Sequence, residues 1–291
     1  MRRAALWLLL IMLASYSIAY SAVKDLNISW SDIEGLSIND GVVILSEGDR
    51  VDIYDDKTAQ VLDTTKLKVD CVSSDVKIIP EDREDIYVEM KGYHISSPGY
   101  KVPVLNLTQD GETLNIEVQH SKNNNFLNRL SLDLTILVPQ SYQGDLNVNT
   151  VSGDVSLQFG EYESLVVNTV SGDVSTSSTS VVEGEFDTTS GDVKLRDYQG
   201  AVRVKSISGD TDIQYDQFTE DANVQSTSGS VIVSVPQGEN FGIDVSTTSG
   251  EIQNTHEMII DKLSDRKLIA HTNSHEHVIN VSTISGDISI R

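Results

Sequence analysis

Acidic residues recur at a fixed spacing in the second half of the chain, and a row of carboxylates could bind a divalent cation. Asp follows a Ser-Gly dipeptide at Asp154, Asp173, Asp192 and Asp210. If these copies stacked as neighbouring strands about 4.8 Å apart, their oxygens could ligate Ca²⁺. The alternative is that each Asp caps its own turn in solvent, because repulsion between such charges in water costs only about 1 kcal/mol. The Gly-rich nonapeptide of calcium-binding rolls does not occur in the sequence, so we favour turn capping.

Three histidines near the C-terminus form a second candidate metal site. His275 and His277 flank Glu276, so a strand would place both imidazoles on one face, and His271 lies close by in sequence. Such a pair could bind Zn²⁺ or Cu²⁺. No spacing here matches an established zinc site and no Cys is near, so a His-rich surface loop is the favoured interpretation. We expect no bound cofactor.

The sequence gives little support for catalysis. A serine nucleophile needs a nearby base, yet no His lies between His120 and His256, a span that contains six of the seven Ser-Gly dipeptides. Paired carboxylates hydrolyse glycosides in some β-helices, but here they recur along a repeat without forming a unique cluster. Cys71 takes the place of a small hydroxyl residue in a degenerate copy, which predicts a buried side chain. We therefore expect no enzymatic activity.

These residues belong to a repeat centred on Ser-Gly, whose seven copies are separated by 19, 19, 18, 20, 21 and 36 residues. Four positions before each Ser the side chain is apolar, and two positions before it is Thr or Ser. The dipeptides are Ser152-Gly153, Ser171-Gly172, Ser190-Gly191, Ser208-Gly209, Ser228-Gly229, Ser249-Gly250 and Ser285-Gly286.

The apolar alternation changes phase at each Ser-Gly, and this predicts a corner between two strands. Before the Ser, apolar side chains occupy even offsets; after it, they occupy offsets of three and five. The backbone must turn there to keep both strands facing one core, and Gly allows a positive φ. We predict an all-β, single-chain parallel β-solenoid (β-helix-like) with rungs of about 19 residues. An antiparallel sandwich or meander is the alternative, but it gives no reason for one corner sequence to recur.

The repeat suggests a domain organisation. Residues 1–22 have a short basic start, an apolar run and small residues, which is typical of a signal peptide; an uncleaved membrane anchor is the alternative. Residues 23–65 are predicted to be a strand-rich N-terminal cap or degenerate rungs, and 66–291 the solenoid. The insertion 255–278 is predicted to contain a helical stretch over 257–268 and to cover the rung of the final copy, whose edge would otherwise be open.

Charge excludes one class of partner. The chain carries 44 Asp and Glu against 21 Lys and Arg, a formal net charge of −23. Such a protein repels phosphate backbones, so nucleic-acid binding is excluded as a function. Membrane association is expected only if the N-terminal segment stays uncleaved.

The repeated pattern of alternating apolar residues, Thr and Ser-Gly-Asp resembles a bacterial envelope family catalogued as "putative adhesins", a domain of unknown function. It is similar to LiaG-like proteins, which are associated with cell-envelope stress. The copies from Leu146 to Val233 and the closing Val281–Ile290 carry the resemblance. This resemblance implies a β-helical, exported, non-enzymatic protein located in the periplasm or at the cell surface.

The expected function is therefore that of a surface interaction module with a rigid acidic face. Its partner would be a glycan, a cell-wall polymer or a surface protein. The first alternative is an envelope scaffold or stress-associated structural protein without adhesion. The second is a carbohydrate-active β-helix enzyme.

Overall fold

The prediction of an all-β fold is confirmed. The computed structural model describes residues 36–39, 42–45, 50–61, 64–95, 101–120, 129–273 and 276–291, which form strands joined by turns and contain no helix. Consequently, none of the described residues forms a helix that could cross a membrane. The predicted signal peptide, 1–22, lies outside the described residues.

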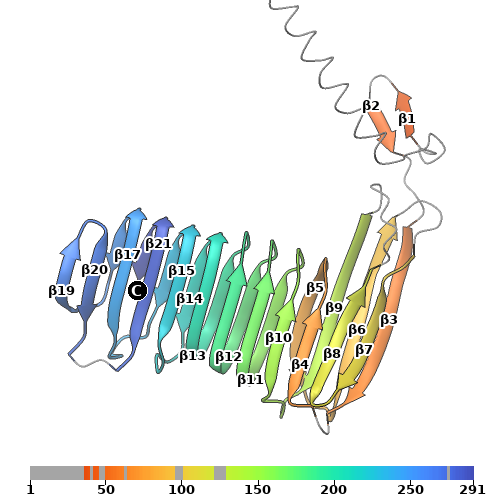
Figure 1. Cartoon of the computed structure of the whole chain (residues 1–291), viewed down its shortest axis with the longest axis horizontal. Helices are drawn as coiled ribbons and strands as arrows, with labels where there is room; N and C mark the ends of the chain where they lie inside the picture. Colours follow the sequence, from red (N-terminus) through yellow and green to blue (C-terminus); the bar gives the residue numbers. More distant parts are fainter. Residues whose placement is uncertain are drawn as a thin grey trace, which may run out of the picture. The chain divides into compact units, whose positions relative to one another are not determined.

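The chain divides into two compact units, Met1–Arg50 and Val51–Arg291. In the first unit, β1 (Leu36–Asn39) and β2 (Val42–Leu45) pair as an antiparallel hairpin. All other strands join in one continuous hydrogen-bonded sheet, in which they stand side by side (Figure 1).

The strands of this sheet fall into two groups. The first group precedes the full repeats: β3 (Arg50–Gln60), β4 (Lys66–Asp70), β5 (Ser74–Glu81), β6 (Asp85–Ile95), β7 (Val104–Asp110), β8 (Thr113–Gln119) and β9 (Arg129–Pro139). The second group carries the Ser-Gly copies and the insertion: β10 (Asp145–Asn149), β11 (Val155–Thr169), β12 (Val174–Thr188), β13 (Val193–Ser208), β14 (Thr211–Tyr215), β15 (Ala222–Ser228), β16 (Val231–Ser234), β17 (Gly242–Ser249), β18 (Ile252–Asn254), β19 (Ile259–Ser264), β20 (Lys267–His271), β21 (Val278–Ser285) and β22 (Ile288–Ile290).

Successive copies of the repeat pair in parallel with equivalent residues opposite each other. Val155 of β11 pairs with Val174 of β12, which in turn pairs with Val193 of β13. The sequence separation between paired residues is 17 to 20 along β11 to β16. Because side chains alternate between the two faces of a strand, this register places like residues in columns.

The inward columns form the hydrophobic core. The apolar position four residues before each Ser is buried in every copy. Larger side chains fill the wider part of the interior, where aromatic rings meet edge to face with centroids 5.0 to 6.3 Å apart. These rings are Phe186, Tyr198, Tyr215, Phe218 and Phe241.

The part before the full repeats mixes the two pairing directions. β5 pairs in parallel with β9 and β11, and β4 in parallel with β8 and β10. By contrast, β6 is antiparallel to β9, and β7 and β8 form an antiparallel hairpin. The degenerate copy at Ser74 thus joins the same sheet as the full copies.

The structure corrects the prediction for the C-terminal end. The final copy does not form the end of the stack, because β21 pairs with both β15 and β17, and β22 with both β16 and β18. The spatially last copy is the sixth one, in β17 and β18. The 36-residue interval gives the chain enough length to leave β18, turn back and insert its last copy between the fifth and the sixth.

The insertion is a β-hairpin, so the predicted helical stretch over 257–268 is wrong. β19 pairs antiparallel with β20, and β20 pairs antiparallel with β17. Leu268 and Ala270 are buried two residues apart, which is strand periodicity, and the β-branched Ile259 and Ile260 also favour a strand. The insertion does cover an edge, but that edge belongs to β17 and not to the final copy.

Candidate functional site

The Ser-Gly corners lie in one column, where successive glycines are in close contact. A Cβ added to Gly172 would lie 2.0 Å from the carbonyl oxygen of Gly153, and one added to Gly191 would lie 2.0 Å from that of Gly172. The same holds for the remaining corner glycines: a Cβ added to any of them would clash with the carbonyl oxygen of the corner glycine before it in space. In spatial order these glycines are Gly209, Gly229, Gly286 and Gly250. No side chain fits at such a distance, which explains why Gly recurs.

The reason for Gly differs from the sequence prediction at most corners. A positive φ, the expected reason, occurs only at Gly209 (144°) and Gly229 (139°) among the corner glycines. At Gly172 and the others, the close approach of the neighbouring backbone alone excludes a side chain.

The corner carboxylates form a ladder of hydrogen bonds between copies. The backbone amide of Asp173 donates to Oδ1 of Asp154 at 2.8 Å, that of Asp192 to Asp173 at 2.9 Å, and that of Asp210 to Asp192 at 2.9 Å. The ladder begins at Asp75, which accepts from the amide of Asp154 at 3.0 Å. Each Asp therefore caps the backbone of the next copy, whereas the sequence analysis expected it to cap its own turn.

The ladder uses one oxygen of each carboxylate, and at Asp192 it favours the ionised form. The amide of Asp210 lowers the pKa of Asp192 below the ordinary value of 3.8, and Lys194, 3.0 Å from its Oδ2, acts in the same direction. Among the residues that the structure describes, no group of three or more His, Cys, Asp or Glu is placed to hold a metal ion. In this ladder, the corner Asp column links neighbouring copies through hydrogen bonds to their backbone.

The corners differ in the hydrogen bond that the amide of the corner glycine makes. The Thr or Ser hydroxyl two positions before the corner Ser accepts this bond in some copies and not in others, a difference that the sequence analysis did not predict. In the first three full copies, Oγ1 of Thr150, Thr169 and Thr188 accepts a hydrogen bond from the amide of the corner glycine, at 2.9 to 3.2 Å. In three of the later copies, the glycine amide donates instead to a Ser carbonyl of the adjacent copy, as Gly209 does to Ser228 at 3.2 Å. The hydroxyls left without a described partner there are those of Ser206, Ser226 and Thr283.

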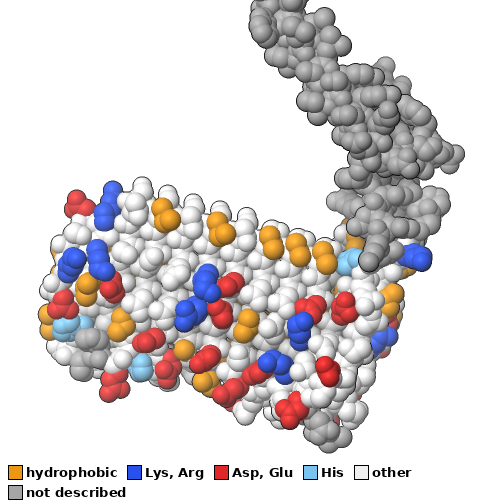
Figure 2. Space-filling view, in the orientation of Figure 1, with side chains coloured by type: hydrophobic (Ala, Val, Ile, Leu, Met, Phe, Trp, Pro, Cys, Tyr) orange, Lys and Arg blue, Asp and Glu red, His pale blue; other side chains and the backbone are white. Residues whose placement is uncertain are grey.

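A stripe of β-branched side chains runs along the outside of the corner column. The residue directly before each corner Ser points outward, and the apolar members are about half exposed. Figure 2 shows a row of hydrophobic side chains along the upper edge of this unit. The apolar members are Val72, Val151, Val170, Ile207 and Ile284.

The two described candidate histidines make different contacts. Nε2 of His271 lies 3.7 Å from Oδ1 of Asp261, while the ring of His277 packs edge-on against Phe218 with centroids 6.4 Å apart. His275 lies outside the described residues. Cys71 is buried, as predicted, and burial raises the pKa of its thiol, so thiolate chemistry is disfavoured.

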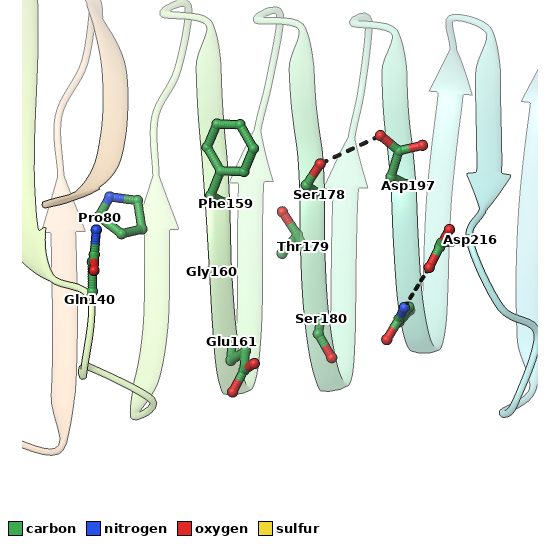
Figure 3. Close-up of a pocket in the computed structure, with 11 residues that line it drawn as sticks. Pro80, Gln140, Phe159, Gly160, Glu161, Ser178, Thr179, Ser180, Asp197 and Asp216 are labelled. Atoms are coloured by element: carbon green, nitrogen blue, oxygen red, sulfur yellow. Dashed lines mark hydrogen bonds between the residues drawn. The ribbon is translucent and has the colours of Figure 1, made fainter.

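A groove across three successive copies was not predicted from the sequence. It has a volume of about 880 Å³ and crosses β11, β12 and β13 (Figure 3). Its lining residues are Pro80, Gln140, Phe159, Gly160, Glu161, Ser178, Thr179, Ser180, Asp197, Gln199 and Asp216.

Three residues of this groove have a strained backbone at the same repeat position. Phe159, Ser178 and Asp197 each follow a corner Ser by seven residues, and their φ angles are 47°, 52° and 48°. A non-glycine residue in this region costs of order 1–3 kcal/mol, and such strain is concentrated at functional sites. The only sequence signal was the shared offset of seven, because the three side chains are chemically unrelated.

Side chains pair along the groove floor. Oγ of Ser178 donates to Oδ2 of Asp197 at 3.4 Å, and Nε2 of Gln199 donates to Oδ2 of Asp216 at 2.8 Å (Figure 3). The ring of Phe159 at the other end is 63% exposed. The groove thus combines one exposed aromatic ring with fixed hydroxyl, amide and carboxylate groups.

Comparison with known proteins identifies a family and shows only remote structural likeness. The family model described as Toastrack DUF4097 matches residues 64–161 and again 161–291. No curated protein matches the chain in sequence.

Several solved structures resemble parts of the chain. A "putative cell adhesion protein" from Clostridium sporogenes ATCC 15579 is 12% identical, with a TM-score of 0.37 over 82% of this chain and 99% of that one. A "putative adhesin" from Bacteroides fragilis NCTC 9343 is 12% identical, with a TM-score of 0.40 over 82% and 97%. A "putative lipid binding protein" from Parabacteroides distasonis ATCC 8503 is 14% identical, with a TM-score of 0.36 over 82% and 96%.

Proposed function

The chain belongs to the Toastrack DUF4097 family, and from this premise we propose that it is an exported, non-enzymatic protein of the cell envelope that acts as a surface interaction module. Its copies make successive rungs of about 19 residues in one parallel β-solenoid. The pairing of equivalent residues at separations of 17 to 20 supports the solenoid.

One observation carries the interaction role: the corner ladder fixes a long row of exposed side chains in register. From Asp154 to Asp210, each corner amide is bonded to the carboxylate of the preceding copy, so the exposed residues beside it cannot slip relative to one another. A stack of repeats with fixed register offers an extended and rigid surface, which suits extended partners such as glycans, cell-wall polymers or surface proteins. The net charge of −23 disfavours nucleic acid.

The export part of this proposal is tested with the full chain carrying a C-terminal tag. We expect the protein outside the cytoplasm, and we expect intact mass measurement to show loss of about the first 19 to 21 residues by signal peptidase. Exported protein with an intact N-terminus supports the membrane-anchor alternative. Retention in the cytoplasm overturns the proposed function.

The interaction part is tested with the exported form on an array of glycans and cell-wall polymers, with release of reducing sugar ends measured in parallel. Binding without release supports a surface interaction module. Release of reducing ends supports the carbohydrate-active enzyme, and absence of both supports the envelope scaffold.

A further inference from the structure

The groove across β11, β12 and β13 has the features of a binding site for an uncharged sugar chain. Phe159 combines a positive φ with an exposed ring. The equivalent residues in the next two copies, Ser178 and Asp197, share the φ but have small or polar side chains, so the bend recurs with the repeat and does not need an aromatic ring. At Phe159 the bend therefore presents an aromatic face beside the polar groups of the groove, where a ligand can stack on it.

The polar lining specifies the charge of that ligand. The groove contains the carboxylates of Glu161, Asp197 and Asp216, and none of the described residues that line it is Lys, Arg or His. An anionic sugar or a phosphate would therefore meet only repulsion. An uncharged ligand rich in hydroxyls would find acceptors in the carboxylates, and both donors and acceptors in Ser178 and Gln199.

Several of these groups are already oriented before any ligand arrives. Asp197 accepts from Ser178, Asp216 accepts from Gln199, and Glu161 accepts from Nε2 of Gln143 at 2.7 Å. Each carboxylate keeps further lone pairs for a ligand hydroxyl. Such preorganisation lowers the entropic cost of binding.

The spacing of the copies specifies the shape of the ligand. The groove runs across neighbouring strands, which are separated by about 4.8 Å, and one pyranose unit of an extended β-1,4-linked chain has a similar length. Successive sugar units would thus meet equivalent positions of successive copies. The flat face of such a sugar carries C–H groups that pack against an aromatic ring, and its edge carries hydroxyls.

We propose that this groove binds an uncharged, linear β-1,4-linked oligosaccharide, with one sugar stacked on Phe159 and the following units hydrogen-bonded to Ser178, Asp197, Gln199 and Asp216. This inference rests on the proposed function and names both its site and its ligand class. It places binding on the groove, away from the stripe of β-branched side chains outside the corners.

The test is isothermal titration of the exported full-chain protein with cellohexaose and with the hexamer of N-acetylglucosamine. At least one hexamer should bind the wild type, and Phe159→Ala should weaken that binding by about tenfold or more. Phe159→Trp should retain it, because the larger ring still offers a stacking face. Ile207→Ala is the matched control: it removes a side chain that is 55% exposed, outside the groove, and should leave the affinity unchanged.

Stability measurements separate a binding role from a structural one. Phe159→Gly removes both the ring and the backbone strain, so its melting temperature should not fall although binding is lost. A clear fall in melting temperature would mean that Phe159 stabilises the fold, and would count against the proposal. Binding by neither hexamer, or equal affinity in wild type and Phe159→Ala, would overturn it.

These outcomes differ from those that concern the proposed function. If an exported chain binds a glycan on the array with an affinity that survives Phe159→Ala, the groove assignment fails while the interaction role stands. If the chain stays in the cytoplasm, the proposed function fails whatever the hexamers do.

Discussion

The backbone amide of Asp173 donates a 2.8 Å hydrogen bond to Oδ1 of Asp154, nineteen residues earlier in the chain. The same bond recurs up and down the column, so every such carboxylate stabilises the copy that follows it. A cap of this kind couples neighbouring copies and adds to the parallel backbone pairing between them.

Asp173→Ala should destabilise the protein by about 1–2 kcal/mol, because it removes the acceptor for the amide of Asp192. Asp173→Asn should cost less, since its side-chain carbonyl still accepts the bond without the charge. Urea unfolding of the two variants measures the difference. Equal stability of Asp173→Ala and the wild type would show that the ladder contributes nothing.

The stability contribution of Asp192 should depend on pH in one direction. Its pKa is lowered in the folded state, chiefly by the amide of Asp210, so ionisation stabilises the fold. This contribution is complete above the ordinary pKa of 3.8 and is lost as the pH falls through the lowered native value. Asp192→Asn should therefore be less stable than wild type at pH 7. The difference between their free energies of unfolding, measured by urea unfolding, should become smaller at about pH 3. An equal difference in the free energy of unfolding at the two pH values would contradict this linkage.

Gly172→Val should be severely destabilising, by more than about 4 kcal/mol, because its Cβ would lie 2.0 Å from the carbonyl oxygen of Gly153. Ser171→Ala, at the exposed neighbouring position, should change the stability by less than about 0.5 kcal/mol. Thermal unfolding compares them. If the Val variant does not fold, Gly172→Ala should show the same effect in weaker form, whereas an unchanged melting temperature of Gly172→Ala would contradict the close approach.

The two leucines of the β19–β20 hairpin should respond differently to truncation. Leu268 is 7% exposed and packs in the core, so Leu268→Ala should cost about 2–5 kcal/mol and loosen the cover over β17. Leu263 pairs with it in the hairpin but is 69% exposed, so Leu263→Ala should be nearly neutral. Light scattering should also detect association of the Leu268 variant, because uncovering β17 creates an open edge. If the Leu268→Ala and Leu263→Ala variants are both monomeric and equally stable, the hairpin does not protect this edge.

The buried tyrosines Tyr198 and Tyr215 form a matched pair. The hydroxyl of Tyr198 donates to the carbonyl of Ala201 at 2.9 Å, whereas that of Tyr215 has no partner among the described residues. Tyr198→Phe should therefore lower the stability by about 1 kcal/mol, because it removes this buried hydrogen bond. Tyr215→Phe should be neutral or stabilising, since it removes an unpaired polar group from the core. Chemical unfolding of both variants is the measurement, and a larger loss for Tyr215→Phe would reveal a missed partner.

The sequence by itself determined the strands and the corners. Alternation with a period of two is a local property, because it follows from the geometry of one strand and one buried face. The recurrence of Ser-Gly near every nineteenth residue then specified that the copies are equivalent, which is why the buried columns of Val and Thr were predictable. The corner glycines were also located correctly, although close contact between copies, and not positive φ, is the reason for most of them.

Only the tertiary structure decided which copies are neighbours and which side chains meet. The final copy pairs between β15 and β17, and no local signal around Val278–Ser285 specifies that order, because every copy offers the same hydrogen-bonding edge. The backbone amide that bonds to a corner carboxylate belongs to the neighbouring copy, as that of Asp173 does for Asp154. The two groups meet only because the strands pair in this register. The groove arises in the same way: Phe159, Ser178 and Asp197 share no chemistry, and the stacking of three copies alone brings their bends together.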